Sequence, residues 1–192
     1  MKLEVEQKYR IERPDELRRL LTHLGASFRP AVRQIDSYFN HPSRDFAQTD
    51  EALRIRTIGK RNFVTYKGPK LDSRVKTRRE LEQPLADGAE AADRFCELLT
   101  ALGFRATAVV AKWRASAEVD WRDTKYELAW DTVDALGEFL EIELVVDETE
   151  RESAQTRIAA LETELQCNSV ERRSYLEMVL ARGSNPRNSP AT

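Results

Sequence analysis

The chain has 192 residues, 41% hydrophobic and 33% charged, which is the composition of a globular domain large enough to bury a core without disulfides. Its 31 basic and 33 acidic residues give a net charge of −2, so the basic excess expected of a dominant nucleic-acid binder is absent. Two isolated cysteines argue against structural zinc, and the lack of an apolar run of roughly 18 residues argues against a membrane span.

The first element predicted is a strand over residues 2–11, because Leu3 and Val5 alternate with Glu4, Glu6 and Lys8. A helix is predicted from Pro14 to about Gly25, with acidic residues in its first turn and glycine after its last apolar residue. Residues 31–40 alternate again and predict a second strand. The charged N-terminus argues against a secretion signal, so we expect a cytoplasmic protein with no nucleic-acid or membrane partner.

The middle and end of the chain continue with strands and fewer helices. ALRIRTI at 52–58 and NFVTYKG at 62–68 predict a hairpin around Gly59, and 74–85 predicts a long charged strand. A helix over about 89–102 precedes strands over 107–120, 124–133 and 138–146. A helix over 149–165 and a short one within SYLEMVL follow. The composition of residues 183–192 predicts a disordered tail after one domain that spans residues 1–182.

Eight strand candidates with mostly short connections favour antiparallel pairing. An eight-stranded antiparallel sheet can close on itself, so the sequence predicts an α+β fold built on an eight-stranded antiparallel β-barrel with helices packed outside. The pattern leaves the oligomeric state, monomer or dimer, open.

Most of these strands carry charges on one face and apolar residues on the other. Alternation of this kind is typical of the solvent face of a half-buried antiparallel sheet. That interpretation explains less well why bases gather on some strands and acids on others. If the apolar faces lie under helices, the ionic faces line a lumen, where charges need partners such as a polyanion with divalent metal.

The chain resembles the CYTH family, the triphosphate tunnel metalloenzymes. The resemblance begins with E-x-E-x-K at residues 4–8 and runs in order through about 180 residues: QIDSYF at 34–39, LRIR at 53–56, TYKGP at 65–69, RRELE at 78–82, KWR at 112–114, DTVDALGEFLEIE at 131–143 and RSYLEMV at 173–179. The finer matches are similar to the class IV adenylyl cyclase-like branch. The resemblance implies a tunnel whose ionic interior binds a triphosphate and divalent cations.

The resemblance also implies roles for residues at matching positions. Catalytic roles fall to Glu4, Glu6, Lys8 and Asp131. The implied ligands of Mg²⁺ or Mn²⁺ are Glu4, Glu6, Asp131, Glu141 and Glu143. The implied triphosphate-binding bases are Lys8, Arg54, Arg56, Lys67, Arg78, Lys112 and Arg114, with Glu80 and Glu82 as partners that orient the bases or share a second metal.

Two reactions fit such a site. In one, ATP is converted to cyclic AMP and pyrophosphate, which the branch resemblance favours. In the other, inorganic triphosphate, thiamine triphosphate or a nucleoside triphosphate is hydrolysed. Both need charge neutralisation, in-line positioning and metal activation. Ala129 stands where some hydrolysing relatives place an acid, which disfavours hydrolysis slightly.

A non-catalytic polyphosphate or nucleotide-binding module is a third interpretation, but it would not need the paired glutamates. An RNA-binding barrel is disfavoured because Trp113 and Trp130 fall on the face opposite the bases, where they cannot stack on an RNA bound there.

Overall fold

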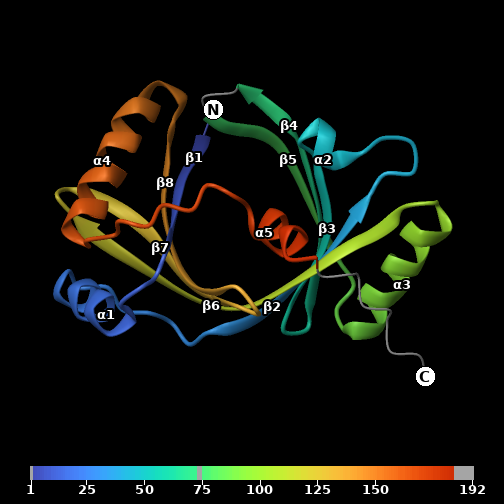
Figure 1. Cartoon of the computed structure of the whole chain (residues 1–192), viewed down its shortest axis with the longest axis horizontal. Helices are drawn as coiled ribbons and strands as arrows, with labels where there is room; N and C mark the ends of the chain where they lie inside the picture. The colour runs from blue at the N-terminus through green and yellow to red at the C-terminus, as the bar shows by residue number, and fades with distance from the viewer. Residues whose placement is uncertain (1, 73–74, 184–192) are drawn as a thin grey trace. The chain divides into compact units, whose positions relative to one another are not determined.

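The computed structural model describes residues 2–72 and 75–183, with side chains for residues 4–69 and 80–183. The strands are β1 (Lys2–Arg10), β2 (Val32–Asn40), β3 (Ala52–Ile58), β4 (Arg61–Asp72), β5 (Val75–Leu85), β6 (Arg105–Trp121), β7 (Thr124–Val133) and β8 (Gly137–Asp147). The helices are α1 (Pro14–His23), α2 (Phe46–Thr49), α3 (Ala89–Ala101), the 3-10 turn η1 (Glu148–Glu150), α4 (Arg151–Glu164) and α5 (Tyr175–Ala181), and Figure 1 shows them all along the chain.

The eight strands form one sheet in the order β1-β8-β7-β6-β2-β3-β4-β5. The strand pairs whose registers are resolved are antiparallel, including the hairpins β3–β4, β4–β5, β6–β7 and β7–β8. The predicted turn at Gly59 is confirmed, and this glycine has a φ of +61°, a conformation that costs glycine little. These findings confirm the predicted α+β fold with eight antiparallel strands.

The chain divides into two compact units. The first comprises residues 1–32 and 112–172, and the second comprises residues 33–111 and 173–192. Strand β6 therefore contributes its second half to the first unit and its first half to the second unit.

The core of the first unit lies on the apolar face of its strands. Val5 on β1 is opposite Leu144 on β8, and Leu128 on β7 is opposite Ile142. All four are buried, and helix α4 lies against β8 and β1, as Figure 1 shows. Because side chains of a strand alternate between faces, this packing leaves the charged residues of the same strands together on the other face.

The core of the second unit is a cluster of apolar residues under helix α3, which contacts β3. Its fully buried members are Phe39, Phe46, Leu53, Ile55, Ala92 and Leu99. Phe46 comes from α2, a single turn that the sequence did not predict. Asp45 begins α2 by accepting a hydrogen bond from the Ala47 amide at 3.1 Å, a typical cap for so short a helix.

The helices predicted from sequence are confirmed, with small changes at their ends. The helix expected from residue 149 begins with η1 and continues as α4. The helix expected within SYLEMVL is α5, which Ser174 and Glu177 cap reciprocally. Residues 184–192 of the predicted tail lie outside the described residues, and no helix in the described part is long and apolar enough to cross a membrane.

Candidate functional site

The ionic face of the first unit places acids and bases in rows across its strands. Glu6 on β1 is opposite Glu143 on β8, which is opposite Glu127 on β7, which in turn is opposite Glu118 on β6. In the next row Lys8 is opposite Glu141. Like charges directly opposite each other on a sheet are destabilising, and Lys125 offsets this repulsion at one end of the row by pairing with Glu118 at 2.6 Å.

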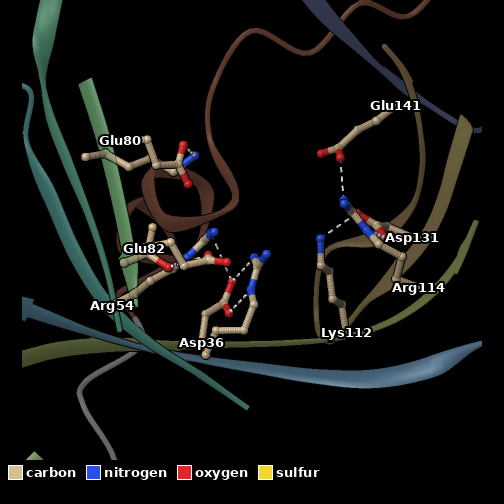
Figure 2. A network of polar contacts seen from close by, with 11 residues as sticks. Asp36, Arg54, Glu80, Glu82, Lys112, Arg114, Asp131 and Glu141 are labelled. Carbon is tan, nitrogen blue, oxygen red and sulfur yellow. Dashed lines mark hydrogen bonds and ion pairs between the residues drawn. The ribbon is translucent and has the colours of Figure 1, made fainter. Parts of the chain in front are cut away.

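A buried cluster of opposite charges lies on the same face. Asp131 on β7 is fully buried and accepts hydrogen bonds from Lys112 Nζ at 2.8 Å and from Arg114 Nε at 2.7 Å, and also from the Arg114 Nη2 (Figure 2). The Nη2 of Arg114 also donates to Glu141 on β8. The Asp131 carboxylate is thus held by two bases on one neighbouring strand, and Arg114 links it to the acid on the other.

This cluster changes the protonation equilibria of its members. Burial, together with the Arg114 charge, lowers the pKa of Lys112 to about 8 despite its contact with Asp131. Burial alone would raise the pKa of Asp131, but hydrogen bonds from Arg114 and the charge of Lys112 lower it to about 2. At neutral pH Asp131 is therefore ionised, and Lys112 is protonated but loses its proton more readily than an exposed lysine.

The pKa of the Glu143 carboxyl group is raised, whereas that of Asp131 is lowered. Its pKa is raised to about 7, by partial burial first and then by the charges of Glu4, Glu127, Glu6 and Glu141 in that order. Glu143 makes no hydrogen bond or ion pair with the rest of the described residues. Partial burial and the four neighbouring glutamates thus both disfavour the ionised form of Glu143.

The donor set fits a hard divalent cation. Mg²⁺ and Mn²⁺ take oxygen ligands, and Glu4 and Glu6 project from the same face of β1 as Glu141 and Glu143 from β8. Among the described residues, no three carboxylate, imidazole or thiol groups already stand in an arrangement that could hold a metal ion. The Glu4 and Glu6 side chains are exposed to solvent.

A pocket of about 220 Å³ opens on this face of the first unit. Arg114, Ser116, Glu127, Glu141 and Glu143 are among the residues that line it. Acids from β7 and β8 and a base from β6 thus share one solvent-accessible hollow, as a site for a metal-bound polyanion requires.

The ionic face of the second unit is centred on Asp36 of β2. Its carboxylate accepts two hydrogen bonds from Arg56, from Nε and Nη2, both at 2.7 Å, and a longer one of 3.4 Å from Arg54 (Figure 2). Asp36 and Arg56 lie directly opposite each other in the register of β2 and β3, which explains the paired geometry. The Arg54 Nε is buried and has no hydrogen-bond partner among the described residues.

The neighbouring β4–β5 hairpin adds a base, Lys67, whose ion pair is partly exposed to solvent. Lys67 on β4 pairs with Glu80 on β5 at 2.8 Å, with about a third of each side chain exposed (33% and 36%). Glu82 accepts a hydrogen bond from Thr65 at 2.9 Å. Glu80 therefore contacts a base, whereas Glu82 contacts a hydroxyl. The side chain of Arg78 lies outside the described residues.

The predicted site residues thus fall on the ionic faces of the two units. The first unit brings together Glu4, Glu6, Lys8, Lys112, Arg114, Asp131, Glu141 and Glu143, and the second brings together Arg54, Arg56, Lys67, Glu80 and Glu82. Their implied roles, and a single tunnel that contains them, stay predictions. In this structure Asp131 orients two bases, and its oxygens are already engaged.

Two residues of these faces, Asp36 and Glu127, were not among the candidate site residues from the sequence. Asp36 lies within the motif QIDSYF at residues 34–39. Its alternation with Ile35 and Ser37 along the predicted strand could have placed it on the ionic face. Glu127 shares a face with Asp131 by the same alternation, but its place beside Glu143 depends on the β7–β8 register, which the sequence does not display.

Comparison with known proteins supports these assignments of fold and family. The CYTH domain model matches residues 2–175. A protein of Methanocaldococcus jannaschii named "Putative adenylate cyclase" is 35% identical over 179 residues, covering 92% of this chain and 98% of its own. A solved structure of a Pyrococcus horikoshii protein is 37% identical with a TM-score of 0.78, covering 94% of this chain and 99% of that one.

A more distant structure adds evidence on the fold alone. A Hippeastrum protein, described as a "putative adenylyl cyclase" with a dominant triphosphatase activity, is 20% identical with a TM-score of 0.63. The alignment covers 94% of this chain and 96% of that one.

Proposed function

Because the chain belongs to the CYTH family, we propose that it is a divalent-metal-dependent enzyme that converts ATP into cyclic AMP and pyrophosphate. The observation that carries the proposal is the ionic face of the first unit. On this face, glutamates whose carboxylates can bind a metal lie beside the buried cluster of Lys112, Arg114 and Asp131. The name of the M. jannaschii relative, at 35% identity over nearly its full length, favours the cyclase reaction. We further propose that residues 1–182, both units together, act as one catalytic domain.

In this proposal the bases hold the triphosphate. Arg114 and Lys112 are fixed by Asp131, and Arg56 and Arg54 by Asp36, so their donors are oriented before the substrate arrives. Guanidinium groups suit phosphate because they donate parallel hydrogen bonds, and preorientation reduces the entropy lost on binding. Lys67 joins them by exchanging Glu80 for a phosphate oxygen.

Glu4, Glu6, Glu141 and Glu143 would hold Mg²⁺ or Mn²⁺, which when bound neutralises phosphate charge and activates an attacking oxygen. In the reaction the ribose 3′ oxygen forms a bond to the α-phosphorus, its proton leaves, and the bond from the α-phosphorus to the bridging oxygen of pyrophosphate breaks. The positive charges of Lys112 and Arg114 stabilise the negative charge that develops on the leaving group.

Hydrolysis of a triphosphate is the second candidate. It is favoured because the bases and the glutamates of the two faces suit phosphate and metal, which inorganic triphosphate would satisfy equally well. The Hippeastrum protein keeps this possibility open for the fold, although at 20% identity it says nothing about this chain.

Product analysis distinguishes the two reactions. The protein is incubated with ATP or inorganic triphosphate and Mg²⁺ or Mn²⁺, and the products are separated by ion-exchange chromatography. We expect cyclic AMP and pyrophosphate in equal amounts from ATP. Orthophosphate with ADP, or orthophosphate with diphosphate from inorganic triphosphate, without cyclic AMP would establish hydrolysis instead.

A further inference from the structure

Besides Arg54 Nε, a second buried polar atom on the ionic face of the second unit lacks a hydrogen-bond partner among the described residues. The Oε1 atom of Gln34 is buried and accepts no hydrogen bond from the described residues. Gln34 as a whole is 7% exposed. A buried carbonyl oxygen without a donor costs about 1–3 kcal/mol, so folded proteins rarely retain one without a use.

Gln34 lies on the same face of β2 as Asp36, because residues two apart on a strand share a face. It is opposite Ile58 on β3, one step along the sheet from the Asp36–Arg56 pair. With a strand rise of about 3.4 Å per residue, Gln34 is roughly 7 Å along β2 from Asp36. That distance separates it from the two arginines that the proposed function assigns to phosphate.

The chemistry of this acceptor differs from that of its surroundings. Arg54 and Arg56 offer N–H donors, which match the acceptor oxygens of a triphosphate. A carboxamide oxygen instead needs an N–H or O–H donor, and a fully ionised inorganic triphosphate has none. The nucleoside part of a nucleotide has such donors in its ribose hydroxyls and in the amino group of adenine.

We propose that Gln34 determines specificity by accepting a hydrogen bond from the nucleoside of a bound nucleoside triphosphate. The inference rests on the proposed function, which places the triphosphate against Arg54 and Arg56, and it adds that the second unit distinguishes a nucleotide from inorganic triphosphate. Such a site forms a hydrogen bond with one ligand, but its buried acceptor stays unpaired when the other ligand binds. This difference lets the site discriminate strongly between the two ligands.

The test compares Gln34→Leu with the wild type and with Gln83→Leu, a matched change at an exposed glutamine on β5. Gln83 is opposite Val64, a core-packed residue, and so lies on the other face of the sheet. Equilibrium binding of ATP and of inorganic triphosphate is measured in EDTA, where metal-dependent turnover cannot occur.

We expect Gln34→Leu to weaken ATP binding about tenfold, the loss of one hydrogen bond to a buried acceptor, and to change triphosphate binding less than twofold. Gln83→Leu should change neither. Binding of 3′-deoxy-ATP and of inosine triphosphate then shows whether a ribose hydroxyl or the adenine amino group is the donor, because the ligand that lacks it becomes insensitive to Gln34→Leu.

Equal weakening of ATP and triphosphate would overturn the proposal, because Gln34 would then contact phosphate or support the fold. Unchanged ATP binding would overturn it as well. If the wild type binds ATP and triphosphate neither in EDTA nor with Mg²⁺ present, the proposed function itself fails. Thermal melting of the ligand-free proteins guards against misfolding: Gln34→Leu should melt no lower than the wild type, since it removes an unpaired buried acceptor.

Discussion

Asp131 and Arg114 lie directly opposite each other on β7 and β6, and the carboxylate of Asp131 receives hydrogen bonds from two nitrogens of the Arg114 guanidinium. Asp36 and Arg56 repeat this relationship on β2 and β3 in the second unit. In each case a second base, Lys112 or Arg54, reaches the same carboxylate. Each unit therefore holds two of its bases with one buried aspartate.

Replacement of Asp131 by asparagine should destabilise the protein by about 3–5 kcal/mol, because it leaves two bases beside a neutral group in a buried position. Asp36→Asn should cost less, since the Arg56 and Arg54 side chains keep more contact with solvent than Lys112, at 17% and 12% exposed against 3%. Urea unfolding at pH 7 measures both values.

Asp123→Asn is the control, because Asp123 is an exposed turn residue with a φ of +58° that asparagine also adopts readily. The double change Asp131→Asn with Lys112→Met should recover part of the lost stability by removing one unpaired charge. If Asp131→Asn unfolds at the same urea concentration as Asp123→Asn, the buried cluster does not contribute to the fold.

The raised pKa of Glu143 predicts a stability that falls with pH in the absence of metal. The folded protein retains the Glu143 proton up to about pH 7, whereas the unfolded chain loses it near pH 4.5. The contribution is therefore complete below pH 4.5 and is lost as the pH rises through 7, by about 1–3 kcal/mol after allowance for solvent screening. Urea unfolding in EDTA from pH 4.5 to 8 follows this change.

Glu143→Gln should flatten the profile across this window, and Glu97→Gln, at an exposed position on α3, should leave it unchanged. Saturating Mg²⁺ should also flatten it, because a bound cation stabilises the ionised form. A wild-type profile with the same slope as Glu143→Gln would show that the glutamates of the row do not repel one another.

Glu6→Gln should affect the metal response more than the substrate. It retains the size of the side chain and removes a hard anionic ligand, so the Mg²⁺ concentration for half-maximal activity should rise about tenfold or more while the KM for ATP at saturating metal changes little. The same substitution should leave the metal-free protein at least as stable, because it relieves repulsion with Glu143. Wild-type metal dependence combined with a large fall in melting temperature would make Glu6 a structural residue.

Lys67→Ala should weaken substrate binding with little effect on the stability of the fold. The Lys67–Glu80 pair is about a third exposed, so its loss should cost less than about 1 kcal/mol of stability. A lysine that contributes a charge-assisted hydrogen bond to phosphate should cost about 1.5–3 kcal/mol in substrate binding, a rise in KM of tenfold or more. Lys125→Ala, which breaks an exposed pair with Glu118, is the matched control. An unchanged KM would remove Lys67 from the triphosphate site.

The fold was predictable because its signals are local. Alternation at period two marks β1 through Glu4, Val5 and Glu6, and Pro14 and Gly25 mark the limits of the first helix. The pairing of Glu143 with Glu127, by contrast, depends on which strands are neighbours and on their register, and a shift of one residue would move every side chain to the other face.

The roles within the site were predictable only to the level of residue type. Bases and acids could be sorted by sign and face, but the sequence does not show that Asp131 is buried between Lys112 and Arg114. It equally conceals the missing partner of Gln34, because satisfaction of a hydrogen bond is a property of three-dimensional packing. The short α2 escaped prediction because a four-residue helix has no periodicity to detect.

The central claim is that these two ionic faces bind a metal and a nucleoside triphosphate. A crystal structure with Mn²⁺ and α,β-methylene ATP, whose carbon bridge blocks release of pyrophosphate, tests it most directly through anomalous scattering from manganese. We predict a manganese peak bonded to carboxylate oxygens of Glu6 and Glu143, with the phosphates bonded to Arg114 and Arg56. Manganese bound elsewhere, or phosphates that contact neither arginine, would contradict the account.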